Sequence, residues 1–160
     1  MRNRTDSPSV TYRRAEPADA AALGAIARSA KAHWGYPVEW LDAWAPELTV
    51  APRFLERHPA WVAEAEGEPV GFAAVRQTSG RCELEHLWVS PSAQGHGIGE
   101  ELFSLAFKES RARGLPLVVE SDPHAAGFYE HLGGQRIGVV LSEVLGTRRE
   151  LPLFEFPSGR

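Results

Sequence analysis

The sequence of 160 residues contains a single cysteine, Cys82. No disulfide can form within the chain, which suits a reducing cytoplasm and makes Cys82 a small strand residue. No apolar run approaches the ~20 residues that a membrane-spanning helix needs. Residues 1–9 also lack the apolar core of a signal peptide. We therefore expect a cytoplasmic protein with no membrane partner.

Clustered positive charge is missing as well. The formal net charge is −4 and the basic residues are dispersed, which argues against nucleic acid or an anionic membrane as the main partner. The short pair at residues 148–149 is expected to be a solvated edge. The length suffices for one sizeable core and is too small for two ordinary domains, so we expect a flexible terminus over residues 1–9 and a single domain over residues 10–157.

Several catalytic motifs are absent. The six histidines show no metal-ligand spacing such as His-Glu-x-x-His and have no thiol companions, so no metal site is expected. No Gly-x-Ser-x-Gly elbow occurs. The group Ser121, Asp122 and His124 is too compact in sequence for a catalytic triad, so hydrolase chemistry is not expected either.

The residues from Glu83 to Arg113 organise the chain. Their pattern predicts a strand over residues 83–89, then a glycine-rich turn, then an amphipathic helix that ends near Gly114. Glycines at positions 95, 97 and 99 remove side chains just where the first helical turn leaves its N–H groups unpaired. The helix dipole adds positive charge there, so a phosphate or pyrophosphate is the expected ligand.

Three phosphate-binding patterns compete for this turn. A Walker loop requires a lysine after its glycines, and none follows here. A dinucleotide fingerprint starting at Gly95 finds an acid about twenty residues on, in Glu120, but Glu100 stands where the third glycine belongs. The third pattern, Gln/Arg-x-x-Gly-x-Gly/Ala, is matched by Gln94, Gly97 and Gly99 after a strand that ends in Val89 and is followed by Pro91.

This third match resembles the coenzyme A pyrophosphate loop of the GNAT superfamily of N-acetyltransferases. A second superfamily signature, Asn-x-x-Ala-x-x-Phe-Tyr followed by Gly-Phe, resembles the segment with Ala125, Phe128, Tyr129 and Gly133. Two positions depart from it, because Asp122 replaces the asparagine and Gly134 replaces the phenylalanine. The opening strand over residues 10–13 and the helix over residues 20–32 fit the same superfamily. The resemblance implies that acetyl-CoA is bound by Leu87, Trp88, Val89, Gln94, Gly95, His96, Gly97, Ile98, Gly99, Asp122, Ala125 and Phe128.

The coarse pattern along the chain agrees with that fold. Hairpin-forming strands are predicted at residues 61–65 and 70–75, a strand buried on both faces at 117–120, and a short helix at 122–132. A closing antiparallel pair is predicted at residues 137–141 and 151–156, with residues 142–150 as its connection. The result is an α+β GNAT fold, with a mixed, mostly antiparallel sheet of about six or seven strands flanked by about four helices.

Acetyl transfer to an amine requires that the nucleophile lose a proton and is helped when the departing thiolate gains one. The resemblance implies that Tyr129 is the acid beside the coenzyme sulfur. For the base, Glu83 and Glu85 are two residues apart on one strand and share a face unless a bulge intervenes. A carboxylate facing a cleft has its pKa raised by desolvation, which suits proton abstraction. Strict alternation turns His86 to the opposite face, unless a bulge of the kind that the resemblance implies lies near it.

The acceptor site is expected near a concentration of aromatic residues. Trp34, Tyr36 and Trp40 are candidates for its lining, since small-molecule sites are mostly apolar, although packing of a second helix on the sheet explains them equally well. The resemblance implies transfer of an acetyl group to a primary amine of a small molecule, a protein N-terminus or a lysine. A coenzyme A-binding sensor without turnover is the alternative, and self-association as a homodimer is left open.

Overall fold

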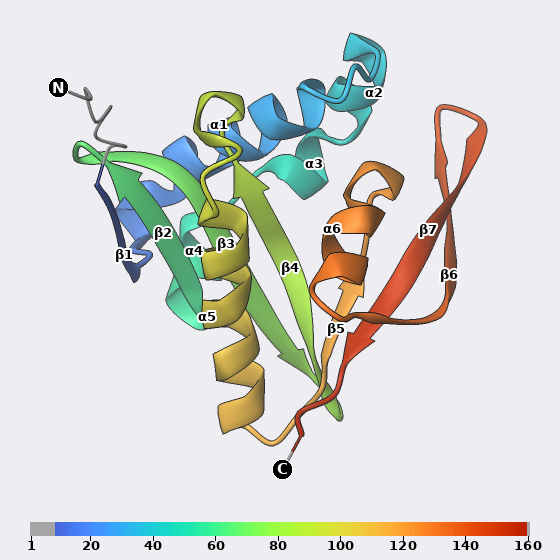
Figure 1. Cartoon of the computed structure of the whole chain (residues 1–160). Helices are drawn as coiled ribbons and strands as arrows, with labels where there is room; N and C mark the ends of the chain where they lie inside the picture. The colour runs from blue at the N-terminus through green and yellow to red at the C-terminus, as the bar shows by residue number, and fades with distance from the viewer. Residues whose placement is uncertain (1–8, 160) are drawn as a thin grey trace, which may run out of the picture.

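The computed structural model describes residues 9–159, so the expectation of a flexible terminus over residues 1–9 falls almost wholly outside it. Seven strands form one sheet in the order β1-β2-β3-β4-β5-β7-β6 (Figure 1). All neighbouring strands are antiparallel except β4 and β5, which confirms the mixed, mostly antiparallel sheet. The strands are β1 (Val10–Arg14), β2 (Ala60–Ala65), β3 (Glu68–Thr78), β4 (Arg81–Val89), β5 (Leu117–Glu120), β6 (Gln135–Val144) and β7 (Thr147–Phe156).

Helices cover both faces of the sheet (Figure 1). Helices α1 to α4 lie on one face, while α5 and α6 lie on the other. The described residues hold six α-helices rather than about four, because two short helices follow α2, one with Pro46 as its second residue and one that begins at Pro52. Proline at the first helical position starts a helix well but cannot continue one. The helices are α1 (Ala20–Ala32), α2 (Val38–Ala43), α3 (Ala45–Leu48), α4 (Pro52–Arg57), α5 (Ile98–Ala112) and α6 (Ala126–His131).

Each face of the sheet has its own core, because side chains alternate along the central strands. On β3, Phe72 and Ala74 are buried under α1 to α4, whereas Ala73 and Val75 are buried under α5. Helix α5 approaches β3 closely at Gly71, where a Cβ atom would lie 3.2 Å from the Leu102 side chain and 3.4 Å from the Ile98 side chain. The small residues of β3 thus serve the packing of α5.

The sheet opens between β4 and β5. Their parallel pairing covers only Cys82 with Leu117 and Glu83 with Val118, and the two strands then diverge toward their carboxyl ends (Figure 1). Beyond Glu83, the edge of β4 that faces β5 therefore has no strand partner among residues 9–159. Backbone N–H and C=O groups along such an edge are available to a ligand.

The final hairpin is longer than predicted. Leu145 and Gly146 form a two-residue turn with φ of 44° and 83°, so the expected connection over residues 142–150 is instead strand. The expectation failed because leucine is a poor residue for positive φ and gives no turn signal. Of the residues of β7, only 153–156 pair with β5. The outer part of the β6–β7 hairpin therefore extends past the end of β5 (Figure 1).

Candidate functional site

Two cavities meet where β4 and β5 separate. The first, which we call the donor cavity, has a volume of about 340 Å³ and lies between the end of β4, the start of α5 and α6. The second, the acceptor cavity, has a volume of about 430 Å³ and lies between β4, β5, the β6–β7 hairpin and the ends of α1 and α3. Trp88 lines both cavities. The two cavities are therefore adjacent at Trp88.

The glycine-rich turn shapes one end of the donor cavity. Gly95 and Gly97 have φ of 83° and 78°, and Gly97 immediately precedes α5 in this left-handed conformation. Glycine is favoured there because other residues are strained at positive φ. No atom lies within 4 Å of the position of a Cβ on either residue, so the backbone is open to a ligand at the positive end of the helix dipole.

Most residues predicted to bind the cofactor line this cavity. They are Leu87, Trp88, Val89, Gln94, Gly95, Gly97, Ile98, Gly99, Ala125 and Phe128. His96 does not line it and instead lies in a hollow beside Glu66 and Glu68 of the β2–β3 turn. Asp122 lines the acceptor cavity instead.

Tyr129 also lines the donor cavity. Its ring packs against Phe103, Phe128 and Phe154, and the residue is 6% exposed. Its hydroxyl makes no hydrogen bond with residues 9–159. In that range every fully buried side-chain oxygen has a hydrogen-bond partner, so the Tyr129 hydroxyl oxygen is not fully buried. The hydroxyl is therefore open to the cavity. Burial raises the pKa of Tyr129, which keeps the hydroxyl protonated and able to donate.

Asp122 joins three separate segments. Its carboxylate accepts hydrogen bonds from the Tyr36 hydroxyl at 2.9 Å, the Arg149 guanidinium at 3.1 Å and the His124 backbone N–H at 2.8 Å. Burial acts to raise the pKa of Asp122, but these hydrogen bonds prevail and lower it. The acid in place of asparagine thus fastens the loop after α1 and the β6–β7 hairpin to the end of β5. It follows that Arg149, 9% exposed in its side chain, is no solvated edge.

The predicted aromatic residues differ in position. Trp34 lines the donor cavity, where its ring stacks on His124 at 5.3 Å. Tyr36 contacts Asp122, as above, and stacks on Trp40 at 5.9 Å. Trp40 lines neither cavity and packs beside the core under α1 to α4. Of the three, only Trp34 lines a cavity; Tyr36 lines neither and is connected to the acceptor cavity through its hydrogen bond to Asp122.

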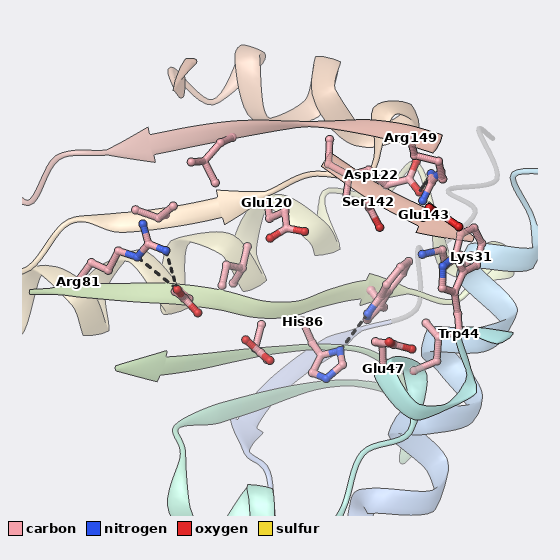
Figure 2. Close-up of a pocket in the computed structure, with 18 residues that line it drawn as sticks. Lys31, Trp44, Glu47, Arg81, His86, Glu120, Asp122, Ser142, Glu143 and Arg149 are labelled. Atoms are coloured by element: carbon pink, nitrogen blue, oxygen red, sulfur yellow. Dashed lines mark hydrogen bonds and ion pairs between the residues drawn. The ribbon is translucent and has the colours of Figure 1, made fainter. Parts of the chain in front are cut away.

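A β-bulge on β4 sets the direction of the candidate bases. Ala74 pairs with His86 and Val75 pairs with Leu84, so Glu85 is the extra residue. A bulge re-aims the side chains that follow it. Glu83, Glu85 and His86 all line the acceptor cavity, and Figure 2 shows His86 there. The prediction from strict alternation that His86 faces the opposite side is wrong.

The electrostatic expectation for Glu83 is also wrong. Its carboxylate accepts hydrogen bonds from Arg81 at 2.8 Å and from Arg76 at 3.0 Å. Burial acts to raise the pKa of Glu83, but the two guanidinium groups outweigh burial and lower the pKa. The Glu85 carboxylate lies 3.6 Å from the same Arg76 side chain, so the two glutamates do share one side of the strand.

Glu120, at the carboxyl end of β5, faces these glutamates from across the opening. Burial, together with the charges of Glu83 and Glu85, raises the pKa of Glu120. Its carboxylate forms no hydrogen bond or ion pair with any residue from 9 to 159. The raised carboxylate pKa that the sequence suggested for the glutamates of β4 is therefore found at Glu120 of β5.

Sequence reasoning assigned no acceptor-site role to Lys31, Glu120 or Arg149, all of which line this cavity. Glu120 could have been found, since it ends a buried strand beside the central one, and ligands bind at the carboxyl ends of parallel strands. Lys31 and Trp44 belong to different helical segments and meet only through tertiary packing. Arg149 was hidden by the misread hairpin.

The sheet order, the splayed parallel pair and the glycine turn before α5 define an acetyltransferase-type α+β fold. Residues 26–134 match the Acetyltransferase (GNAT) family. The chain belongs to this family.

Two curated relatives are similar over part of the chain. Uncharacterized N-acetyltransferase YjgM of Escherichia coli is 32% identical over 92 residues, which cover 52% of this chain and 55% of that protein. Mycothiol acetyltransferase of Streptomyces avermitilis is 39% identical over 79 residues, which cover 46% of this chain and 26% of that protein. The matches thus span about half and about a quarter of these relatives' lengths.

Solved structures share the fold over nearly the whole chain. A GCN5-related N-acetyltransferase from Rhodopseudomonas palustris superposes with a TM-score of 0.75 at 24% identity, covering 94% of this chain and 95% of that one. The yncA protein of Salmonella typhimurium, whose structure includes acetyl-CoA, superposes with a TM-score of 0.71 at 24% identity, covering 95% of each chain. At these identities the likeness shows the fold.

Two negative findings apply to residues 9–159. No helix there is both long and apolar enough to cross a membrane. No group of three or more histidine, cysteine, aspartate or glutamate side chains is arranged there to hold a metal ion.

The burial of His86 predicts a pH dependence of stability. The ring is 9% exposed, its Nδ1 accepts a hydrogen bond from Trp88 Nε1 at 3.2 Å, and burial lowers its pKa from 6.5 to about 4. Because the unfolded chain binds this proton first, His86 stabilises the fold above pH 6.5 and that contribution is lost as the pH falls toward 4. The loss should be roughly 3 kcal/mol.

Urea unfolding at pH 7.5 and pH 4 measures this loss. His86→Gln, which cannot take up the proton, should lose roughly 3 kcal/mol less than the wild type over that interval. His33→Gln, at an exposed position after α1, is the control and should lose as much as the wild type. Equal losses in all three proteins would contradict the assignment.

Proposed function

We propose that the protein transfers the acetyl group of acetyl-CoA to a primary amine, by direct attack of the amine on the thioester. The observation that carries the proposal is the meeting of two cavities beside Trp88, one with a glycine-lined helix N-terminus and the other with free carboxylates. A pyrophosphate-bearing donor suits the first, and an amine suits the second. The acceptor is an amine of a small molecule, a protein N-terminus or a lysine side chain.

The donor cavity fits coenzyme A on three counts. Its glycine turn leaves backbone N–H groups of the first turn of α5 open to a pyrophosphate. Leu87 and Val89 line it beside the unpaired edge of β4, where an amide-bearing arm finds hydrogen-bond partners. Ala125 and Phe128, at and in α6, give the cavity an apolar side that suits the methylene groups of the coenzyme A arm. Acetyl-CoA supplies a thioester whose carbon accepts the amine.

In the overall reaction one C–N bond forms and one C–S bond breaks, and the ammonium gives up two protons, one of which ends on the thiolate while the other passes through the base to water. The hydroxyl of Tyr129, open to the donor cavity and protonated at neutral pH, is suited to donate that proton. The backbone N–H near Leu87 is suited to polarise the carbonyl, since oriented donors stabilise the charge that develops there. Positioning between two rigid walls supplies much of the remaining rate.

For the base we propose Glu85 and Glu120, acting through water, rather than Glu83. Glu83 lies five residues before Trp88, ~16 Å along an extended strand, and its charge is held by two arginines. Glu85 lies three residues before Trp88, ~10 Å by the same measure and less across a bulge. Glu120 stands opposite Glu85 with a pKa raised by burial and by the charges of Glu83 and Glu85, which favours proton uptake.

A coenzyme A-binding sensor of the same fold is the second candidate, favoured by the likeness of fold alone. It would bind acetyl-CoA and release it unchanged. Thiol release measured against a panel of primary amines separates the two, since only the enzyme forms an acetylated product in proportion to the thiol.

The glycine turn yields a first prediction for the donor site. Gly97→Ala should lower the affinity for acetyl-CoA by at least about tenfold, because a methyl group at φ 78° strains the turn and fills the backbone approach. Gly80→Ala is a matched control, since Gly80 has φ of 80° and open surroundings in the β3–β4 turn. Calorimetric titration of both folded variants is the measurement. Equal affinities would remove the turn from the binding site.

A second prediction concerns the acid. Tyr129→Phe should lower kcat by ~10²-fold with little change in acetyl-CoA affinity, because it removes a proton donor and preserves the ring packing. Single-turnover kinetics, with chemistry shown to be rate-limiting, provides the readout. A variant with the wild-type rate would leave Tyr129 a packing residue.

The third prediction concerns the base. The acidic limb of kcat/KM against pH reports the base of the free enzyme. The double variant Glu85→Gln with Glu120→Gln should flatten this limb, whereas Glu83→Gln should retain it because hydrogen bonds from two arginines lower the pKa of that carboxylate. The profiles of the two single variants show which carboxylate dominates. If the double variant keeps both the limb and the rate, the base lies elsewhere and His86 would be tested next.

A further inference from the structure

One positive charge in the acceptor cavity has no partner. Lys31, at the end of α1, lines the cavity, and its Nζ lies 3.7 Å from the centre of the Trp44 ring. The side chain forms no hydrogen bond with any residue from 9 to 159 and has no carboxylate oxygen within 4.0 Å there. An aromatic face attracts an ammonium group, but it cannot accept conventional hydrogen bonds from three N–H donors.

The other basic side chains of this cavity are already paired. Arg81 holds Glu83 at 2.8 Å, and Arg149 holds Asp122 at 3.1 Å. The Lys31 end of the cavity therefore holds one paired cation, Arg149 with Asp122, and one unpaired cation, Lys31; the carboxylates of Glu47 and Glu143 also line this end and form no ion pair with residues 9–159. Figure 2 shows Lys31, Trp44, Arg149 and Asp122 gathered at one end, with Arg81 at the other.

The surroundings of Lys31 favour the arrival of an anion. Burial lowers the pKa of Lys31 to about 8, and the charge of Arg149 adds to the effect, against the opposing charges of Asp122 and Glu47. Glu143 also lines this end but lies on the exposed surface of β6. A partly buried cation without a counter-ion is costly, and a bound carboxylate would both pair with it and restore its proton affinity.

Lys31 also lies next to the acyl donor. Its chain neighbour Ala30 lines the donor cavity, as does Trp34 one turn further on, while Lys31 lines the acceptor cavity. Trp34 in turn contacts Trp88, the residue that both cavities share, at 5.8 Å between ring centres. A carboxylate held by Lys31 is therefore close to an amine positioned for attack beside Trp88.

We propose that Lys31 binds the carboxylate of an acceptor whose reactive amine is on the neighbouring carbon, so that the acceptor is a free amino acid or a similar amino carboxylate. Resting on the proposed acetyl transfer, this selects a small molecule over a protein N-terminus or lysine side chain, which has no free carboxylate beside the amine. The opposite end of the cavity, with Glu85 and Glu120, receives the acceptor's side chain and the proton of its ammonium.

The test compares amines that differ only in this carboxylate. A panel of L-amino acids is assayed against the corresponding L-amino acid amides, with thiol release and acetylated product both measured. The amide is the weaker base and is more often deprotonated at neutral pH, so a preference for the carboxylate reflects binding. Against the best acceptor, the wild type should prefer the acid over its amide by roughly 10- to 100-fold in kcat/KM, the range of a hydrogen bond to a charged group.

Lys31→Met should remove this preference by raising KM for the acid, with KM for the amide and kcat for both little changed. Methionine keeps an unbranched side chain against Trp44. Lys108→Met is the matched control, since Lys108 is the only other lysine of the chain and is exposed on α5. Lys31→Arg should retain part of the preference.

A binding measurement makes the result independent of turnover. The enzyme saturated with coenzyme A is titrated calorimetrically at pH 8 with the amino acid and its amide, in two buffers of different ionisation enthalpy. The acid should bind more tightly and take up a proton, and Lys31→Met should lose both effects.

The outcomes separate the two proposals. Carboxylate-selective binding without any acetylated product would overturn the transferase and leave the Lys31 site standing. Transfer to acids and amides at equal rates, or an equal loss for both in Lys31→Met, would overturn the Lys31 site and leave the transferase standing.

Discussion

The separation of β4 from β5 is the constraint on which the rest of this structure depends. Only two residue pairs join these parallel strands, and beyond Glu83 the two strands no longer pair. The opening leaves a strand edge without a partner, which is costly unless a ligand or another segment uses it. The donor cavity lies against the exposed end of β4, and the acceptor cavity lies in the gap itself. One interruption of hydrogen bonding thus creates both halves of the candidate site.

Two local departures from regular structure refine this opening. The bulge at Glu85 turns His86 toward the acceptor cavity, and the left-handed turn before α5 opens the helix N-terminus to the donor cavity. Between them, the hydrogen bonds of Asp122 to Tyr36 and Arg149 connect segments that are far apart in sequence. Buried ionic groups of this kind are costly to leave half-paired. The wall between the cavities is therefore expected to hold a single arrangement.

The sequence predicted the sheet class, the central strand, the glycine turn and α5 because each depends on local patterns: alternation, glycine placement and helical periodicity. Of the twelve residues predicted as cofactor contacts, ten line the donor cavity, since these cluster in two short segments. It failed where tertiary structure decides. The bulge reversed the direction of His86, two arginines lowered the pKa of Glu83, and Leu145 adopted a positive φ. Lys31 and Trp44 meet only because α1 and α3 pack side by side, which no spacing in the sequence reveals.

The β6–β7 hairpin can change in evolution independently of the donor cavity. Its outer part pairs with no other strand of the sheet, yet it contributes Ser142, Glu143 and Arg149 to the acceptor cavity and no residue to the donor cavity. Changes in hairpin length or sequence can therefore alter which acceptor is accommodated while the turn before α5 and the end of β4 stay intact. Substitutions confined to this hairpin would therefore reshape the acceptor cavity and leave the donor cavity unchanged.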